Sequence, residues 1–308
     1  HGHVFRFAVK DINGELSPEV VSDYLSALAD LILDVSLPFI WAQLKTRHRP
    51  DAKFAVIGYG KLGSKELGYA SDLDIIFLYD DDAPEAGEVY ARLAQRINNW
   101  FNSLTSAGLL YETDLQLRPD GNSGLLVSSV AAFHDYQLNK AWVWEHQAIT
   151  RARFVAGDKA LAAHFEATRL AVMIMPRERE ALKQSVLAMR EKMRATQHLA
   201  PDLFDLKHSP GGIIDVEFLV QYLLLAHTKD HPALSQNIGN IALLKLLAQL
   251  GIIDLVAAEK VVLAYRDYRH SQHLMKLQGL QALHLPLSSV SEHASSVSAL
   301  WQHVFFSP

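Results

Sequence analysis

The hydrophobic positions near the start of the chain repeat with the period of an α-helix. Between residues 17 and 46, apolar side chains recur every three or four positions, at Val21, Leu25, Leu28, Ile32 and Val35, which places them on one helix face. Ser17 is suited to cap this helix, with Pro18 as its first residue and Glu19 in its first turn. The pattern therefore predicts one long helix over 17–46, kinked at Pro38.

Two apolar runs that follow a polar connector at 45–53 predict buried strands. The runs are FAVIG, residues 54–58, and LDIIFLY, residues 73–79. Each is apolar at nearly every position, as in strands that are covered on both faces. An amphipathic run that begins at Val89 then predicts a helix closed by Gly108.

Residues 109–119, LLYETDLQLRP, alternate between two faces and predict a further strand. One face holds Tyr111, Thr113, Leu115 and Leu117, and the other holds Glu112, Asp114, Gln116 and Arg118. Beyond residue 124 the pattern predicts only helices, at 129–156, 158–172, 177–197, 211–228, 237–250, 254–283 and 289–305. We therefore expect an α+β protein with an N-terminal helical extension at 1–50, a small mixed sheet with helices at 51–157, and a helical bundle domain at 158–308.

Composition and charge limit the classes of molecule that the chain is expected to bind. The formal net charge of −5 and the isoelectric point of about 6.3 disfavour nucleic acid, because proteins that follow a phosphate backbone carry a basic excess. We see no uninterrupted apolar run of membrane-spanning length, and therefore expect no membrane association. The absence of cysteine excludes disulfides and thiolate zinc sites. Together with the lack of a visible signal peptide, it favours the cytoplasm.

Several polar residues are better explained by structure than by chemistry. The chain opens HGHVFRFAVKD without an initiating methionine, which indicates a fragment of a longer protein, and His1 and His3 are expected in a frayed terminus. His270 and His273 are spaced to share a helix face but lack a third metal ligand. The predicted helix at 129–156 carries Trp142, Trp144, Arg151 and Arg153, for which core packing and surface pairing are favoured over stacking against an adenine.

The residues between the two apolar runs allow two chemical interpretations. Gly58, Gly60 and Gly63 form G-x-G-x-x-G, as in a dinucleotide-binding turn, and Asp80 lies where a ribose-binding acid would follow. That site requires a parallel strand reached through a crossover of a dozen or more residues. Residues 61–71, which contain two glycines, are too short for it. We therefore set the oxidoreductase interpretation aside.

The second interpretation is a nucleotidyl-transfer site built on carboxylates. Asp72 and Asp74 are spaced i, i+2 at the start of a strand, so both side chains project from one face. Neighbouring carboxylates repel unless a cation lies between them, and Mg²⁺ prefers such ligands together with substrate phosphates. Asp114 is the candidate third carboxylate, and Glu112, on the same predicted face, is its rival. The alternative is that these acids only solvate a strand edge.

Five residues are candidates for contacts with phosphate. Gly63 and Ser64 are expected to open a short helix whose amides and hydroxyl hold phosphate oxygens. Lys61 in the same turn can add positive charge, or remain solvated. Arg118 shares the face of Asp114 and can orient that carboxylate, meet phosphate or form a structural ion pair. Lys207 is expected to meet either a triphosphate or the acids of the following apolar helix, Asp215 and Glu217.

The segment GSKELGYASDLD resembles the signature of the DNA-polymerase-β-like nucleotidyltransferases. With YETDLQLRPDGNSGLLV, AWVWEHQAITRARFVAGD and FDLKHSPGGIIDVEFLVQYL, it is similar in order and spacing to glutamine synthetase adenylyltransferase over most of residues 1–305. Enzymes of that family have two nucleotidyltransferase halves, and this chain resembles one. The block at 144–147, Trp-Glu-His-Gln, is closer to the adenylylating half. Ser64 stands where the family often has a second glycine.

The resemblance implies a polymerase-β-like fold and transfer of AMP from ATP to a tyrosine hydroxyl of glutamine synthetase, with release of pyrophosphate. It further implies two Mg²⁺ ions held by Asp72, Asp74 and Asp114, and β- and γ-phosphates held by Gly63 and Ser64. Glutamine and a PII-type signalling protein are the implied effectors. The alternatives are the deadenylylating half, which performs phosphorolysis of adenylyl-tyrosine, a nucleotidyltransferase with another protein or small-molecule acceptor, and a docking module without turnover.

Overall fold

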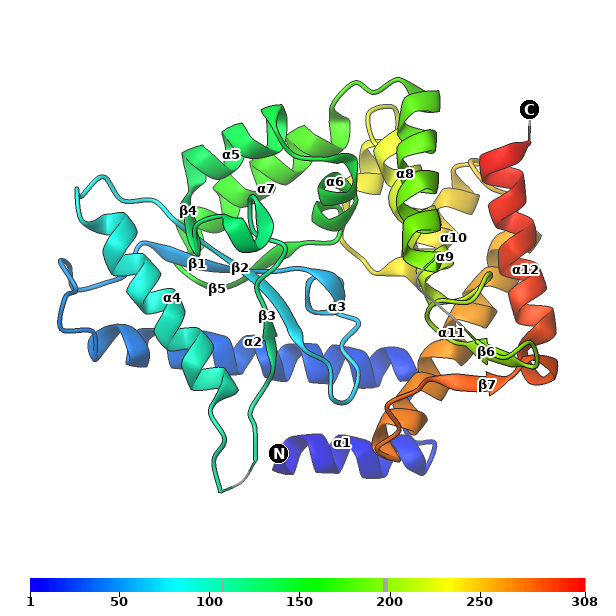
Figure 1. Ribbon diagram of the computed structural model, residues 1–308, viewed down its shortest axis with the longest axis horizontal. Helices are drawn as coiled ribbons and strands as arrows, with labels where there is room; N and C mark the ends of the chain where they lie inside the picture. Colours follow the sequence, from blue (N-terminus) through cyan, green and yellow to red (C-terminus); the bar gives the residue numbers. More distant parts are fainter. Residues whose placement is uncertain (107, 196–198, 308) are drawn as a thin grey trace. The chain divides into compact units, whose positions relative to one another are not determined.

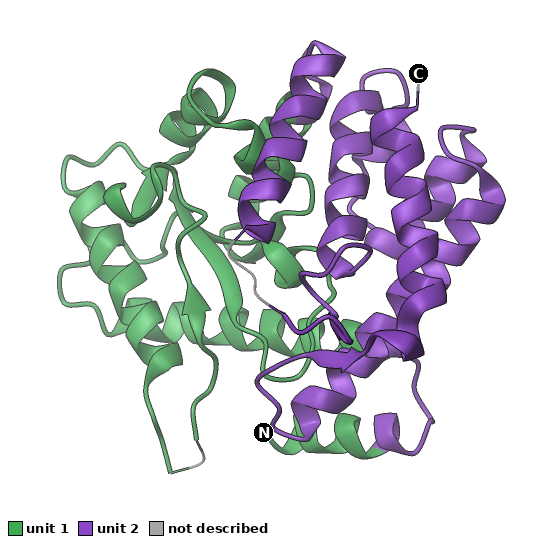
Figure 2. Ribbon diagram, turned by 45° about the vertical axis from the view of Figure 1, so that its right-hand side comes forward, with its two compact units in different colours: residues 1–9, 20–172 green, residues 10–19, 173–308 purple. Residues whose placement is uncertain are grey.

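The computed structural model describes residues 1–106, 108–195 and 199–307, which form two compact units (Figures 1 and 2). The first unit comprises residues 1–9 and 20–172, and the second comprises residues 10–19 and 173–308. The first contains a mixed sheet with helices and the second is mainly helical. The predicted α+β class is therefore confirmed.

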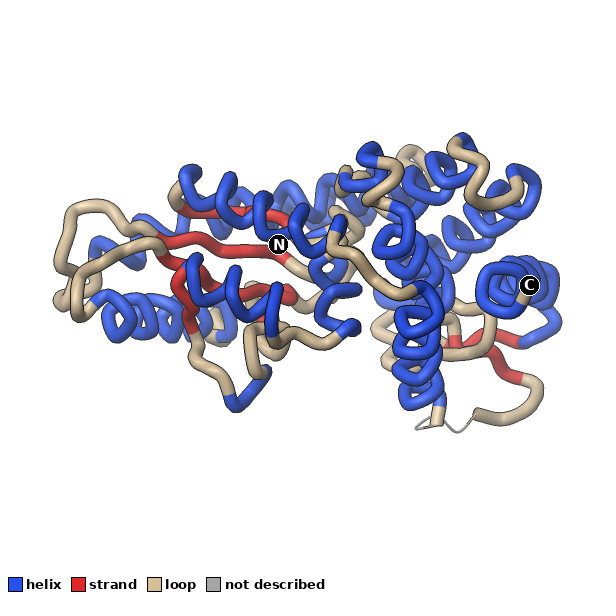
Figure 3. The backbone as a smooth tube through the Cα atoms, turned by 90° about the horizontal axis from the view of Figure 1, so that it is seen from above, coloured by secondary structure: helices blue, strands red, loops and turns tan. Residues whose placement is uncertain are grey.

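The first unit is organised around a five-stranded mixed sheet (Figure 3). Its strands are β1 (Phe54–Gly58), β2 (Leu73–Tyr79), β3 (Thr113–Asp114), β4 (Val127–Ser129) and β5 (Arg153–Gly157). They run in the order β3-β2-β1-β5, and β4 also pairs with β2. β1 is antiparallel to β2 and β5, whereas β3 and β4 are parallel to β2. The two predicted apolar strands are thus confirmed as the centre of the sheet.

Helices cover both faces of this sheet (Figure 1). On one face are α2 (Pro18–Ala42) and α4 (Ala86–Asn102), and on the other are α5 (Val130–Asn139), α6 (Val143–Ile149) and α7 (Lys159–Ile174). Aromatic rings fill the first interface, where Tyr90 stacks on both Trp41 and Phe54 with centroids 5.6 and 5.7 Å apart. The second holds a cluster of fully buried side chains that includes Ile57, Ile76, Phe133 and Phe165. Because β1 alternates between these interfaces, it is apolar throughout.

The second unit packs its helices around α9 (Ile213–His227). The surrounding elements are α8 (Arg179–Arg194), the 3₁₀ turn η2 (Pro232–Ser235), α10 (Asn240–Gln249), α11 (Leu255–Leu277) and α12 (Leu287–Phe306). All of these contact α9, which explains why that helix is apolar on every side. A short antiparallel sheet of β6 (Leu203–Asp205) and β7 (His284–Pro286), which was not predicted, completes the unit.

The single helix predicted for 129–156 is wrong. The segment instead contains the end of β4, then α5, α6 and β5. The side chain of Ser129 accepts a hydrogen bond from the amide of Ala132 (3.2 Å) and so starts α5. β5, with the sequence RFVAG, pairs antiparallel with β1. A short apolar run beside a helix has no period of its own, so only its partner strand reveals it.

Other predicted boundaries also shift. The N-terminus is not frayed, because α1 (Gly2–Ile12) is helical. α4 ends well before Gly108, which belongs to a reverse turn closed by mutual backbone bonds with Thr105. The strand predicted over 109–119 is reduced to β3, since the amide of Gln116 bonds the Asp114 carboxylate (2.8 Å) and turns the chain; the 3₁₀ turn η1 (Gly121–Ser123) follows. Residues 196 and 197 of the predicted helix at 177–197 lie outside the described residues.

α2 meets the length and composition of a membrane-spanning helix, as do core helices of many proteins. It packs here as part of the first unit. Ser26 accepts a hydrogen bond from the amide of Leu67 (3.4 Å), and Asp30 pairs with Arg153 (2.8 Å). One face of α2, which includes Leu25, Leu33 and Leu37, is buried in the structure.

Candidate active site

The backbone of the turn after β1 is bonded to the start of β2. Tyr59 donates its amide to the carbonyl of Asp74 (2.8 Å), and the single-turn helix α3 (Gly60–Gly63) follows. A Cβ on Gly63 would lie 2.3 Å from the carbonyl oxygen of Arg151, so only glycine fits there. Because β2 returns antiparallel to β1, the parallel strand of a dinucleotide-binding unit is absent from this described segment. The oxidoreductase interpretation is excluded.

Three carboxylates converge at one end of β2. Ligand oxygens of Asp72, Asp74 and Asp114 all lie within 4.8 Å of one another. Parallel pairing places Asp74 directly opposite Asp114, and the amide of Gln116 fixes one oxygen of Asp114. Glu112 contributes its backbone carbonyl to the amide of Leu73 (2.9 Å), while its side chain is exposed. The register therefore places Asp114 in the cluster and leaves Glu112 outside it.

The electrostatics of this cluster favour a bound cation. Burial, followed by the charge of Asp72, raises the pKa of Asp74 to about 6. Asp114 adds to this rise, whereas Arg151 and Lys61 oppose it. A divalent ion would remove the repulsion among the carboxylates, and an all-oxygen donor set suits Mg²⁺. The residues present therefore fit the metal that the fold implies.

The prediction that Gly63 and Ser64 open a short helix is wrong. They lie at the C-terminal end of α3, where their amides bond the carbonyls of Tyr59 (2.7 Å) and Gly60 (3.2 Å). The buried hydroxyl of Ser64 donates to the Gly60 carbonyl (3.1 Å) and to the carboxylate of Glu66 (2.9 Å). Contact of this hydroxyl with a phosphate therefore requires one of these bonds to break.

Arg118 and Lys207 have surroundings that differ from those expected. Arg118 donates to the carbonyls of Leu115 (2.7 Å) and Gly124 (3.4 Å), which stabilises the loop after β3 rather than the Asp114 carboxylate. Lys207 lies in the second unit and is exposed. The cations that pair with Asp215 are Arg190 and Arg194 instead.

Arg151 was not identified from the sequence as a residue of the site. It lies in the turn before β5, with its carbonyl against Gly63 and its charge acting on Asp74. Its neighbour Arg153 is structural, since it bonds Asp30 (2.8 Å) and the carbonyl of Leu62 (3.0 Å). The sequence offered no signal for this position, because the run after Arg151 is too short for its period to separate a strand from a continuing helix.

Comparison with known families agrees with this geometry. The family model of glutamate-ammonia ligase adenylyltransferase matches residues 1–168, more than half of the chain. The chain belongs to this family. Within it, residues 180–300 also match the model described as GlnD PII-uridylyltransferase, so the helical unit of this adenylyltransferase-family chain is similar to that of a second family.

Similar curated proteins carry one description, bifunctional glutamine synthetase adenylyltransferase/adenylyl-removing enzyme. The chain is 54% identical to the protein from Aromatoleum aromaticum over 305 residues, which is 99% of this chain and 32% of the relative. Identity is 51% for the proteins from Nitrosomonas eutropha and Chromobacterium violaceum, again over 99% of this chain and 34% of each relative. This member of the family thus spans about a third of the length of its curated relatives.

Proposed function

We propose that this chain is the adenylylating part of such an enzyme and moves AMP from ATP to a tyrosine hydroxyl of glutamine synthetase. The cluster of Asp72, Asp74 and Asp114 in a member of this family carries the proposal. In the reaction, the phenol oxygen bonds to the α-phosphorus of ATP, the bond from that phosphorus to the bridging oxygen breaks, and pyrophosphate leaves.

The three carboxylates would hold Mg²⁺, which supplies charge neutralisation for the phosphates and lowers the pKa of the attacking phenol when bound. Asp114 is the residue that we assign to accept the phenol proton. The amide of Gln116 bonds one of its oxygens, and β3 lies at the edge of the sheet. Lys61 and Arg151, whose charges already act on Asp74, would meet the phosphate oxygens.

The choice of the adenylylating half rests on the sequence block at 144–147. Here the block packs within the first unit, where the buried Glu145 accepts from Tyr136 Oη (2.9 Å) and His146 bonds the carbonyl of Gln137 (2.8 Å). Deadenylylation by phosphorolysis uses the same type of metal site and is the second candidate. Control by glutamine and a PII-type protein follows from the family resemblance, and a cytoplasmic location follows from the lack of cysteine; both belong to the same proposal.

Incubation with α-labelled ATP, Mg²⁺ and unmodified glutamine synthetase tests the reaction. We expect AMP on one tyrosine, located by mass spectrometry, and loss of at least a thousandfold in rate in Asp74→Asn. The exposed Asp82→Asn serves as the charge-matched control and should retain full activity. Release of ADP from adenylylated glutamine synthetase and phosphate, without forward transfer, would favour the deadenylylating half. ATP binding without transfer to any acceptor would contradict catalysis.

A further inference from the structure

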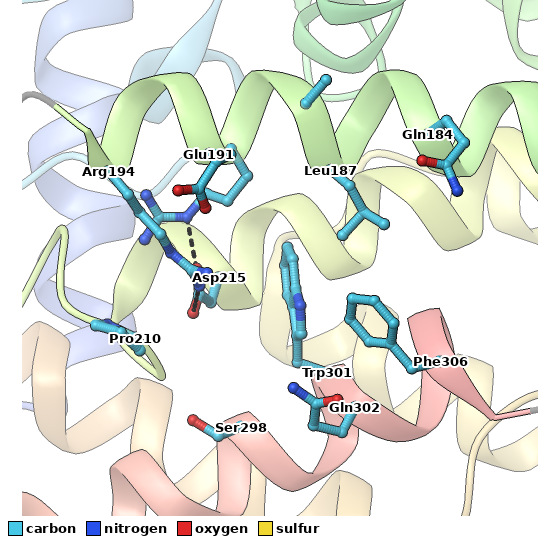
Figure 4. Close-up of a pocket in the computed structure, with 12 residues that line it drawn as sticks. Gln184, Leu187, Glu191, Arg194, Pro210, Asp215, Ser298, Trp301, Gln302 and Phe306 are labelled. Atoms are coloured by element: carbon cyan, nitrogen blue, oxygen red, sulfur yellow. Dashed lines mark hydrogen bonds and ion pairs between the residues drawn. The ribbon is translucent and has the colours of Figure 1, made fainter.

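A pocket of about 400 Å³ lies entirely within the second unit, between α8, the start of α9 and α12 (Figure 4). The proposed transfer reaction assigns it no role. Its lining is divided. The charged groups of Arg194, Asp215 and Glu191 occupy one end, where Arg190 bonds Asp215. Apolar side chains including Leu187 and Phe306 occupy the other. Such a division suits a ligand with a charged and an apolar part.

The charged end carries two arginines, Arg190 and Arg194, and two carboxylates, Asp215 and Glu191. Asp215 accepts from Arg190 Nε (2.5 Å), from Arg194 Nη2 (2.7 Å) and from the amide of Gly211 (2.7 Å). Its carboxylate is thereby saturated by two guanidinium ions and neutralises only one of them. Glu191, whose side chain is exposed, also lines the pocket, and its charge, like that of Asp215, acts on Arg190.

Part of this positive charge lacks a hydrogen-bond acceptor. Arg190 is fully buried, and neither its Nη1 nor Nε of Arg194 has a partner among the described residues. An unpaired buried donor is costly, most of all when it is charged. An anionic group at this end of the pocket would accept from these arginines after small side-chain shifts.

The opposite end can hold a planar ring. Between the two ends, the nearly buried ring of Trp301 lies against Arg194, whose guanidinium carbon is 5.5 Å from the ring centroid, and so forms a rigid wall. Phe306, 58% exposed, and Leu187 offer apolar surface beside it. The amides of Gln184 and Gln302 add hydrogen-bond donors and acceptors at the rim, with no further charge.

We infer that this pocket binds a nucleoside monophosphate, with its phosphate at Arg190 and Arg194 and its base against Leu187 and Phe306. The volume accommodates a molecule of this size, guanidinium groups are the preferred partners of phosphate, and glutamine amides match the edge of a base. Binding here needs no divalent cation, which distinguishes the pocket from the carboxylate cluster of the first unit.

Calorimetric titration of the whole chain with AMP in EDTA tests the inference. We expect saturable binding, with adenosine and inorganic phosphate each at least tenfold weaker because each lacks one of the two recognised parts. UMP and GMP titrations then show which base is preferred. Absence of AMP binding at millimolar concentration, or phosphate binding as tightly as AMP, would overturn the inference.

Two variants locate the site. Arg194→Gln should weaken AMP at least tenfold, whereas Arg179→Gln, an exposed arginine on the same helix, should leave affinity unchanged. Gln302→Glu, at an exposed position, should also weaken AMP by repulsion and covers the case in which Arg194→Gln fails to fold. Binding that survives both variants but is lost in Asp74→Asn would place AMP in the first unit and refute the assignment.

Discussion

Gly60 lies directly against the carboxylate of Asp74: a Cβ on Gly60 would stand 2.0 Å from Asp74 Oδ2. The backbone of Gly60 also has a φ of +50°, which side chains rarely adopt. Position 60 is therefore restricted to glycine twice, by its conformation and by the space that the carboxylate occupies. The G-x-G-x-x-G spacing serves the carboxylate cluster rather than a dinucleotide.

Gly60→Ala should lower the rate of adenylyl transfer about a hundredfold with only a modest loss of stability. The methyl group displaces Asp74, and a misplacement of about 1 Å at a reacting centre costs on the order of a hundredfold in rate. Holding an alanine at a positive φ costs about 1 to 2 kcal/mol in the free energy of unfolding. Gly14→Ala is the matched control, since Gly14 has a φ of +71° and open space around it. Equal activity losses in both variants would contradict the steric explanation.

Asp114→Asn should weaken Mn²⁺ binding at least tenfold, whereas Glu112→Gln should leave it unchanged. Both residues were candidates for the third ligand, but only Asp114 lies opposite Asp74 in the β2–β3 pairing. Electron paramagnetic resonance titration of free Mn²⁺ measures both affinities. A loss confined to Glu112→Gln would assign the ligand to the rival position.

Asp215→Asn should destabilise the second unit by about 3 kcal/mol, because it leaves two guanidinium groups uncompensated at a buried site. Urea unfolding of this variant, followed by tryptophan fluorescence, gives the free energy. Asp202→Asn removes an exposed carboxylate nearby in sequence and should cost less than about 0.5 kcal/mol. Similar losses in the two variants would show that burial of the ion pair does not increase its contribution to the free energy of unfolding.

The carboxylate of Asp81 makes the stability of the fold depend on pH in the acid range. It accepts hydrogen bonds from His48 Nε2 (2.8 Å), Arg49 Nη1 (2.7 Å) and Tyr90 Oη (2.8 Å). Burial by itself would raise the pKa of Asp81, but hydrogen bonds, led by those from His48 and Tyr90, hold it well below the usual range. A depressed folded-state pKa stabilises the fold above the unfolded-state value, near 4, and this contribution is lost as the pH falls further.

Asp81→Asn should therefore be less stable than the wild type at pH 7 by about 1 to 3 kcal/mol, with a difference that shrinks below pH 4. Urea unfolding at pH 7, 5 and 3.5 measures it, and Asp82→Asn at the neighbouring exposed position provides the baseline. A difference independent of pH would show that the carboxylate charge does not contribute.

Local patterns were sufficient for the elements that carry the chemistry. The apolar runs of β1 and β2 and the helix that begins at Pro18 follow directly from residue spacing. β5 was missed because Arg153–Gly157 carries no period that separates a short strand from a helix. Ser64 was placed at the wrong end of α3, since a Gly-Ser pair suits either end of a single helical turn.

The sequence by itself determined that Asp72 and Asp74 share one face beside a glycine turn, because side chains two positions apart in a strand always do. Only the tertiary structure decided that Asp114 rather than Glu112 completes the cluster, and that Arg151 faces it. Strand alternation places both Asp114 and Glu112 on the same face of the strand. Which of them reaches Asp74 depends on hydrogen-bond register between strands distant in the chain, and register is a property of the folded sheet.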